Sequence, residues 1–171
     1  MTAQLAATFP KVVALDVSED QIRLAKELLR ARADNVTFVQ VNEPTIPLED
    51  RSAAAMFSSH VFQHLPGLAE VARYVGETFR VLKSGGTICF HLPVVGAHRG
   101  APTSPVRLAV HNLAARVRRL LGILNVMEYH RYSSEQVLTM LRSIGFRDAE
   151  LRIFDMASNG DAHSFFLARR P

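Results

Sequence analysis

Short apolar runs alternate with amphipathic stretches in the first part of the chain. Lys11–Val17 is an apolar run that ends near an acid, which is typical of a buried parallel strand. Residues 18–30 carry apolar side chains at helical spacing, and Ser18 with Gln21 forms a capping-box pattern in front of them. After a polar break, Val36–Val41 is predicted to be a second strand. This region therefore has the β-α-β order of a parallel sheet.

The middle of the chain repeats this order. Ala53–Ser58 is predicted to be a third, alanine-rich strand, and residues 68–82 have apolar side chains at helical spacing. Lys83–Gly86 is expected to end that helix with a glycine C-cap and a tight turn. Thr87–Leu92 then forms the fourth predicted strand.

The last part predicts two more helices and two strands. Residues 106–124 form an amphipathic helical pattern, and Ser133 caps a further helix that Gly145 ends. Closing strands are expected near Ala149–Phe154 and Ser164–Ala168. The order predicts an α/β, Rossmann-like, mostly parallel sheet with helices on both faces.

Length and composition indicate one globular domain, residues 1–171, with a basic helical insert or lid at about 96–128. The single cysteine excludes an internal disulfide and a multi-cysteine zinc site. No apolar stretch is long enough to span a membrane, and the N-terminus does not resemble a signal peptide. We therefore expect a cytoplasmic protein.

The insert concentrates positive charge, although the net charge is only +4. Its basic residues, without any Asp or Glu between Gly96 and Met127, are Arg99, Arg107, Arg116, Arg118 and Arg119. This pattern fits a substrate lid, a dimer contact that makes a homo-oligomer, or a solvated helix face. Binding of nucleic acid or a membrane surface through Arg107, Arg116, Arg118 and Arg119 also stays open.

Three patterns occur in an order that resembles one enzyme family. They are Val12–Ser18, Val39–Glu43, and Met56–Leu65 followed by Phe79–Thr87 with its Leu-Lys-Ser-Gly-Gly turn. Together they resemble class I S-adenosylmethionine-dependent methyltransferases, of the type 11-like methyltransferase domain. The resemblance runs from about residue 3 to the C-terminus, and it is weakest in the insert.

The resemblance implies S-adenosylmethionine as cofactor and methyl transfer to a small-molecule or lipid-like acceptor. Asp16, followed by Val17, would bind both ribose hydroxyls, whose paired donors suit a carboxylate. Alternatively, Asp16 is an ordinary acid near a helix N-terminus. Asn42 stands where the family has an aspartate that contacts the adenine amino group, with Glu43 as a possible substitute. Ser58, which ends its strand, is the fifth candidate cofactor-binding residue.

A glycine-rich turn is expected about 20 residues before the ribose-binding acid. Counting back from Asp16 passes Met1, and residues 2–9 resemble the tail of the helix that follows such a turn. The resemblance thus implies an N-terminally truncated domain without a central strand between the Val12 and Ser58 strands. Three explanations stay open: a truncated sequence, a strand from another chain, or a re-paired sheet in a catalytically silent module that binds a partner protein.

His60 and His64 are the candidate catalytic residues. They are four residues apart, as in helical zinc pairs, but Val61 replaces the metalloprotease glutamate and no third ligand is evident. We therefore predict no metal site. A substrate-side role as base or orienting group competes with packing or helix capping, because methyl transfer depends largely on positioning.

Overall fold

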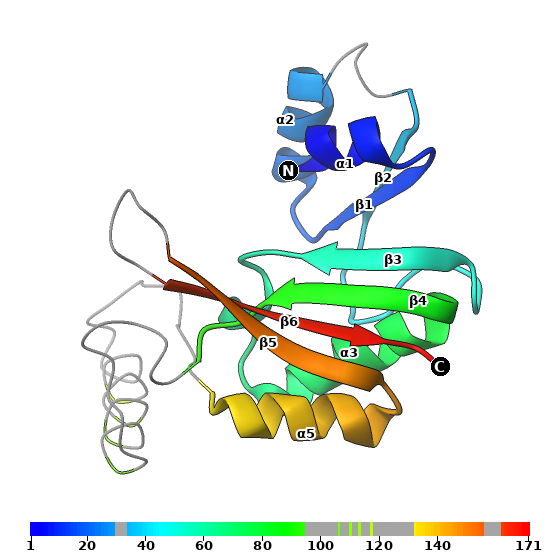
Figure 1. The fold of residues 1–171 in the computed structure, drawn as a ribbon. Coiled ribbons are helices and arrows are strands. Elements are labelled where there is room, and N and C mark those ends of the chain that lie inside the picture. Colours follow the sequence, from blue (N-terminus) through cyan, green and yellow to red (C-terminus); the bar gives the residue numbers. More distant parts are fainter. Residues whose placement is uncertain are drawn as a thin grey trace. The chain divides into compact units, whose positions relative to one another are not determined.

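The computed structural model describes residues 1–29, 34–94, 132–155 and 162–171, together with Val106, Val110, Leu113 and Val117. The chain divides into two compact units, Met1–Pro47 and Leu48–Pro171. Both units combine strands and helices (Figure 1). A single domain over residues 1–171 stays a prediction, and each unit is described separately below.

The first unit is a β-α-β arrangement with a short helix in front. Its elements are α1 (Thr2–Thr8), β1 (Val12–Asp16), α2 (Glu19–Leu29) and β2 (Val36–Gln40). β1 and β2 are parallel, with Val12 opposite Val36 and Asp16 opposite Gln40. The Ser18 hydroxyl accepts a hydrogen bond of 3.3 Å from the Gln21 amide. These elements confirm the predicted strands, the Ser18 cap and the helix before Lys11.

Asn35 connects the ends of two elements in this unit. Its side-chain amide donates to the carbonyls of Ala6 and Phe9 at 2.8 and 2.7 Å. The Val12 amide in turn donates to the Asn35 carbonyl at 2.9 Å. The end of α1 is therefore linked to the beginning of both strands.

The second unit is a four-stranded sheet with the order β3-β4-β6-β5. Its elements are β3 (Ala53–Ser58), η2 (Phe62–His64), α3 (Leu68–Val81), β4 (Leu82–His91), α5 (Ser134–Ile144), β5 (Arg147–Asp155) and β6 (Ala162–Arg169). β3 and β4 are parallel, whereas β6 is antiparallel to both of its neighbours. β3, β4 and β5 thus run in one direction, which confirms the mostly parallel, Rossmann-like α/β fold. The carboxyl ends of β3 and β4 lie at the same edge as the amino end of β6.

Helices α3 and α5 pack on one face of this sheet. Phe90 of β4 and Phe166 of β6 are fully buried and stack with ring centroids 5.5 Å apart. The helical residues of the same core are fully buried as well: Val71, Val75, Val137 and Leu141. The apolar stripes of both predicted helices therefore face the sheet.

Of two predicted helix ends, one is confirmed and the other is wrong. α5 is as predicted: Ser133 and Gln136 form a capping box, and Gly145 ends the helix at φ 113°. The prediction of a glycine C-cap for α3 is wrong, because Leu82 ends that helix in an extended conformation and β4 follows without a turn. Gly85 instead lies inside β4, where the pairing with β3 shifts between Ala53 and Ala55. The amide of Gly85 and the carbonyl of Gly86 pair with Arg170, so this segment has strand partners.

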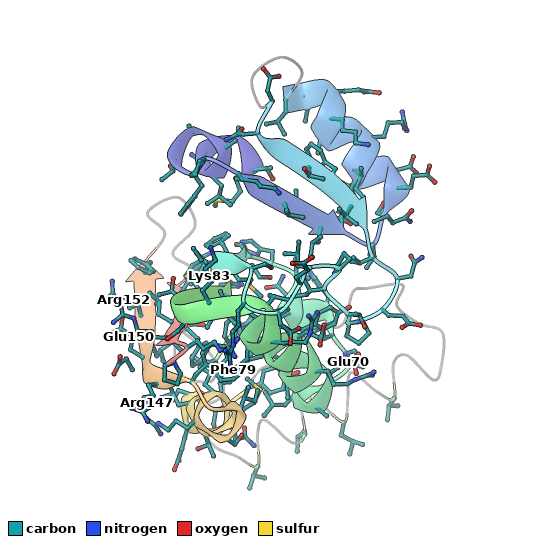
Figure 2. The ribbon with its side chains drawn as sticks, turned by 90° about the vertical axis from the view of Figure 1, so that its right-hand side faces the viewer. Glu70, Phe79, Lys83, Arg147, Glu150 and Arg152 are labelled. Carbon is teal, nitrogen blue, oxygen red and sulfur yellow. The ribbon has the colours of Figure 1, made fainter. Side chains whose placement is uncertain are left out.

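Arg170 binds the carboxyl end of α3. Its guanidinium donates to the carbonyls of Phe79, Arg80 and Leu82, and lies 4.6 Å from the centre of the Phe79 ring. Phe79 is labelled in Figure 2. Cations at this end of a helix satisfy carbonyls that lack an intrahelical partner.

Arg170→Ala is therefore expected to lower the free energy of unfolding by about 2 kcal/mol, since charged donors to carbonyls contribute roughly 1.5–3 kcal/mol. Urea denaturation measures this loss. The control is Arg169→Ala, because exposed Arg169 donates one long hydrogen bond of 3.3 Å to Gly85. Equal losses in the two variants would contradict a role for Arg170 as the cap of α3.

The predicted insert is described at four positions only. Val106, Val110, Leu113 and Val117 are helical and exposed, with 72%, 61%, 61% and 44% of their surface accessible. Arg99, Arg107, Arg116, Arg118 and Arg119 lie outside the described residues. Within the part of the chain that the structure describes, no helix is long and apolar enough to cross a membrane.

Candidate functional site

The first unit brings its predicted cofactor residues to one edge. Asp16 ends β1 and lies opposite Gln40, the last residue of β2. The Val41 amide donates to the Asp16 carbonyl at 3.0 Å, and the Gln40 side chain donates to the Val17 carbonyl at 3.1 Å. Asn42 and Glu43 follow directly and are exposed. The parallel register thus places the acid and the amide at the carboxyl ends of adjacent strands.

The Asp16 carboxylate is held at this edge by a local hydrogen bond. Its Oδ1 accepts from the Ser18 amide at 2.9 Å. Among the described residues, no hydrogen bond reaches its second oxygen, and the side chain is exposed. An oriented carboxylate with a remaining acceptor fits a ribose hydroxyl. The bond to Ser18 supports the role of Asp16 at the start of α2, and its contact with ribose stays a prediction.

Ser58 lies in the second unit. It ends β3, is half-buried and stands opposite Phe90 in the parallel register with β4. It is therefore at the edge where β3 and β4 have their carboxyl ends, two residues before His60.

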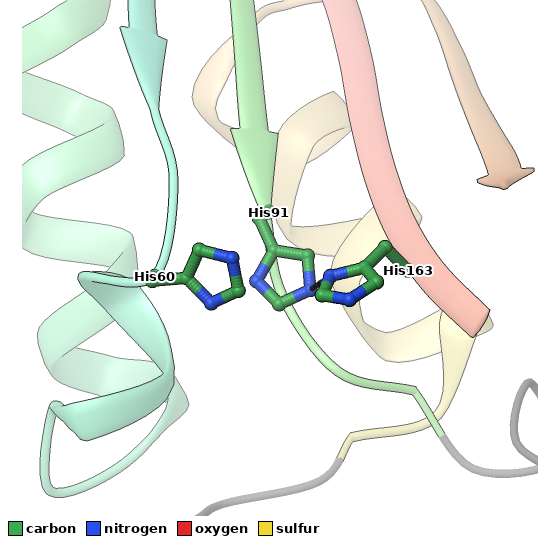
Figure 3. Close-up of side chains that lie close together, drawn as sticks. All are labelled: His60, His91 and His163. Carbon is green, nitrogen blue, oxygen red and sulfur yellow. Dashed lines mark hydrogen bonds between the residues drawn. The ribbon is translucent and has the colours of Figure 1, made fainter. Parts of the chain in front are cut away.

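Three histidines, two from strands and one from the loop after β3, meet at this edge of the second unit (Figure 3). His60 follows β3, His91 ends β4 and His163 is near the start of β6. The ring centroids are 4.6 Å apart for His60 and His91, 5.3 Å for His60 and His163, and 5.0 Å for His91 and His163. Nδ1 of His163 and Nε2 of His91 are within hydrogen-bond distance, 3.2 Å. We call these three residues the histidine cluster.

The strand register explains the histidine cluster. His91 is opposite Phe165, so its side chain lies on the sheet face that carries Phe165 and, two residues earlier, His163. His60 reaches the same face from a left-handed backbone conformation with φ 60°. Burial differs between the members: His91 is 2% exposed, His163 is half-buried and His60 is exposed.

His60 and His64 do not form the helical pair that their spacing suggested. His60 precedes the short helix η2, whereas His64 lies in it and has its Nε2 3.0 Å from the side-chain nitrogen of Gln63. His64 is not a member of the histidine cluster. The sequence reasoning missed His91 and His163, and the absence of a third ligand no longer argues against a metal. Their positions at the ends of predicted strands were the available signal.

Cys89 is not suited to nucleophilic chemistry. It is half-buried in β4, and burial raises the pKa of its thiol. A raised pKa lowers the thiolate fraction at neutral pH, and the thiolate is the reactive form. The histidines therefore remain the candidates for catalysis or ligand binding in the second unit.

Two comparisons with known proteins indicate one family. The family described as "Methyltransferase domain" matches residues 1–90. Demethylmenaquinone methyltransferase of Lactococcus lactis is 33% identical over 97 residues, which cover 56% of this chain and 35% of that protein. The match therefore spans about a third of the relative's length.

Solved structures show the same fold. A structure described as a methyltransferase from Bacillus halodurans matches with a TM-score of 0.75 and 19% identity, and covers 99% of this chain and 87% of that one. Phosphoethanolamine N-methyltransferase 2 of Haemonchus contortus, in complex with phosphomonomethylethanolamine and S-adenosylhomocysteine, matches with a TM-score of 0.70 and 18% identity over 99% of this chain and 46% of that one.

The parallel β-α-β unit and the mixed second sheet are those of a Rossmann-like α/β fold. The chain belongs to the class I S-adenosylmethionine-dependent methyltransferases.

Proposed function

We propose that this chain binds S-adenosylmethionine through its first unit and takes part in methyl transfer to a small-molecule or lipid-like acceptor. The observation that carries the proposal is the β1–β2 register, which brings Asp16 and Asn42 to the same edge at the carboxyl ends of two parallel strands. Ligands of open α/β sheets bind at this edge.

The proposed cofactor contacts follow from donor and acceptor chemistry. Asp16 accepts hydrogen bonds from the ribose hydroxyls, and the side-chain oxygen of Asn42 or Glu43 accepts one from the adenine amino group. Val17, 61% exposed beside Asp16, offers an apolar surface. Ser58, in the second unit, stays a prediction as a cofactor-binding residue. When bound, S-adenosylmethionine supplies an electrophilic methyl group on its sulfonium.

The acceptor class rests on two further observations. The names of the relatives in Lactococcus lactis and Haemonchus contortus give demethylmenaquinone and phosphoethanolamine as their acceptors. Val106, Val110, Leu113 and Val117 add an exposed apolar stripe that suits a lipid-like molecule. His60 and His64 are proposed to orient the acceptor or take its proton. A cytoplasmic location stays a prediction.

One observation favours a second function, a catalytically silent module that binds a partner protein. β1 pairs only with β2, and β3 only with β4, among the described residues. Free strand edges can accept a strand from a partner. This function predicts an oligomer or a stable complex with another protein.

Titration calorimetry with S-adenosylhomocysteine tests the proposal. The chain is expected to bind saturably, and Asp16→Ala is expected to weaken binding about 100-fold, because two hydrogen bonds to a charged acceptor are lost. Asp20→Ala is the control, since Asp20 is also an exposed acid near the start of α2 and forms an ion pair with Arg23.

Three outcomes decide between the functions. Binding that weakens only in Asp16→Ala supports the ribose contact. If Asp16→Ala binds S-adenosylhomocysteine as tightly as the unmodified chain does, Asp16 acts only at the start of α2 and makes no ribose contact. If the folded chain binds no ligand and sedimentation shows an oligomer, the partner-binding module is favoured instead.

A further inference from the structure

The histidine cluster comes close to the spacing of a metal site before any metal is bound. Each of its three members offers one ring nitrogen, and these nitrogens lie within 4.8 Å of one another. Zinc binds imidazole nitrogen at about 2.0–2.1 Å in tetrahedral geometry, so its ligand nitrogens are about 3.3 Å apart. The nitrogens of His163 and His91 are already 3.2 Å apart. Only His60 has to move closer, and it is exposed.

The ring nitrogens of the histidine cluster favour one class of cation. The cluster consists of imidazoles only, without a carboxylate or thiol among the described residues. Neutral imidazole suits zinc and its neighbours among the divalent transition metals, whereas magnesium and calcium require oxygen ligands. Three protein ligands also leave a fourth position for water or a substrate atom, as in catalytic zinc sites.

We propose that His60, His91 and His163 bind a zinc ion, with its fourth coordination position open to solvent beside exposed His60. In the metal-free chain, one ring of the His91–His163 pair donates an N–H to the other. On zinc binding, that ring moves its proton to its other nitrogen, so that both facing nitrogens present lone pairs to the cation. No proton is gained or lost in this change of tautomer.

The place of the site indicates what the open position binds. The cluster lies at the carboxyl ends of β3 and β4, the edge at which ligands of open α/β sheets bind. An oxygen or nitrogen atom of a polar small molecule is the ligand that zinc takes there. The site lies entirely in the second unit, so it does not depend on the proposed cofactor contacts of the first.

Competition titration measures the affinity directly. The chain is stripped of metal with a chelator and titrated with zinc chloride against a chromophoric chelator. The expected result is one equivalent of tight binding and a rise in melting temperature. His60→Ala and His163→Ala are each expected to weaken binding about 100-fold or more, because loss of a direct ligand exceeds the 10–100-fold effect of an outer-shell change. Cobalt substitution should give the visible spectrum of a tetrahedral site.

His64→Ala is the matched control, since it removes a neighbouring imidazole outside the cluster. It should leave zinc affinity unchanged. Buried His91 is kept intact, and circular dichroism verifies that the other variants are folded. Unchanged zinc affinity in both His60→Ala and His163→Ala would overturn the proposal and would point to histidines elsewhere in the chain. Failure of the folded, unmodified chain to bind zinc or cobalt would overturn it as well.

Discussion

Phe166→Ala is expected to lower the free energy of unfolding by about 3–5 kcal/mol, which is the usual cost of removing a buried aromatic side chain. Phe166 is fully buried in β6, and its ring stacks on that of Phe90 at 5.5 Å. Its pairing partner across the β5–β6 ladder is Leu151. Loss of the Phe166 ring would leave a cavity at the centre of the sheet. β6 and its neighbouring strands cannot move to fill this cavity without losing backbone hydrogen bonds.

Urea denaturation of Phe166→Ala and Phe154→Ala measures the difference. Phe154 is the matched control, because it is on the neighbouring strand β5 but 52% exposed, with an edge contact to Phe165 at 5.9 Å. Its loss should cost about 1 kcal/mol, since little apolar surface returns to water. A loss in Phe166→Ala no greater than in Phe154→Ala would show that the core is not organised around the Phe90–Phe166 stack.

The elements that sequence predicts well are those set by local pattern. Ala53–Ser58 has the predicted bounds, and Ser133 and Gly145 delimit α5 as expected. A capping box and a left-handed C-cap depend only on residues within one turn of the helix end. Asp16 and Asn42 share an edge for a similar reason, because a single β-α-β unit fixes their register.

The features that the sequence did not predict depend on distant partners. Lys83–Gly86 looks like a free turn, but its backbone pairs with Arg170, more than 80 residues later. The histidine cluster likewise needs the order β3-β4-β6, and the antiparallel β6 brings its amino end to the carboxyl ends of the others. Spacing along the chain singled out only His64 beside His60 and gave no third histidine. Pairing between strands, which sequence spacing does not contain, selects His91 and His163 instead.

Gly86→Ala is expected to lower the free energy of unfolding by about 2 kcal/mol, since forcing extra volume into a packed site costs roughly 1–3 kcal/mol. An added Cβ at Gly86 would lie 2.8 Å from the Lys83 carbonyl oxygen and 3.1 Å from that of Ala54. Both atoms belong to the backbone, one within β4 and one on β3, so relief requires movement of the paired strands. The irregularity in the β3–β4 register lies at this point.

Gly76→Ala is the control and is expected to raise the free energy of unfolding instead of lowering it. Gly76 lies within α3, and an added Cβ there would meet nothing within 4 Å. Alanine should therefore stabilise the helix by about 0.5–1 kcal/mol, because it lowers the conformational entropy of the unfolded chain. Thermal denaturation of both variants distinguishes the steric cost of an added Cβ at Gly86 from the general effect of replacing glycine by alanine. A stabilised Gly86→Ala protein would mean that the Lys83–Gly86 segment can shift away from β3, and that the close approach at Gly86 is not needed for the sheet.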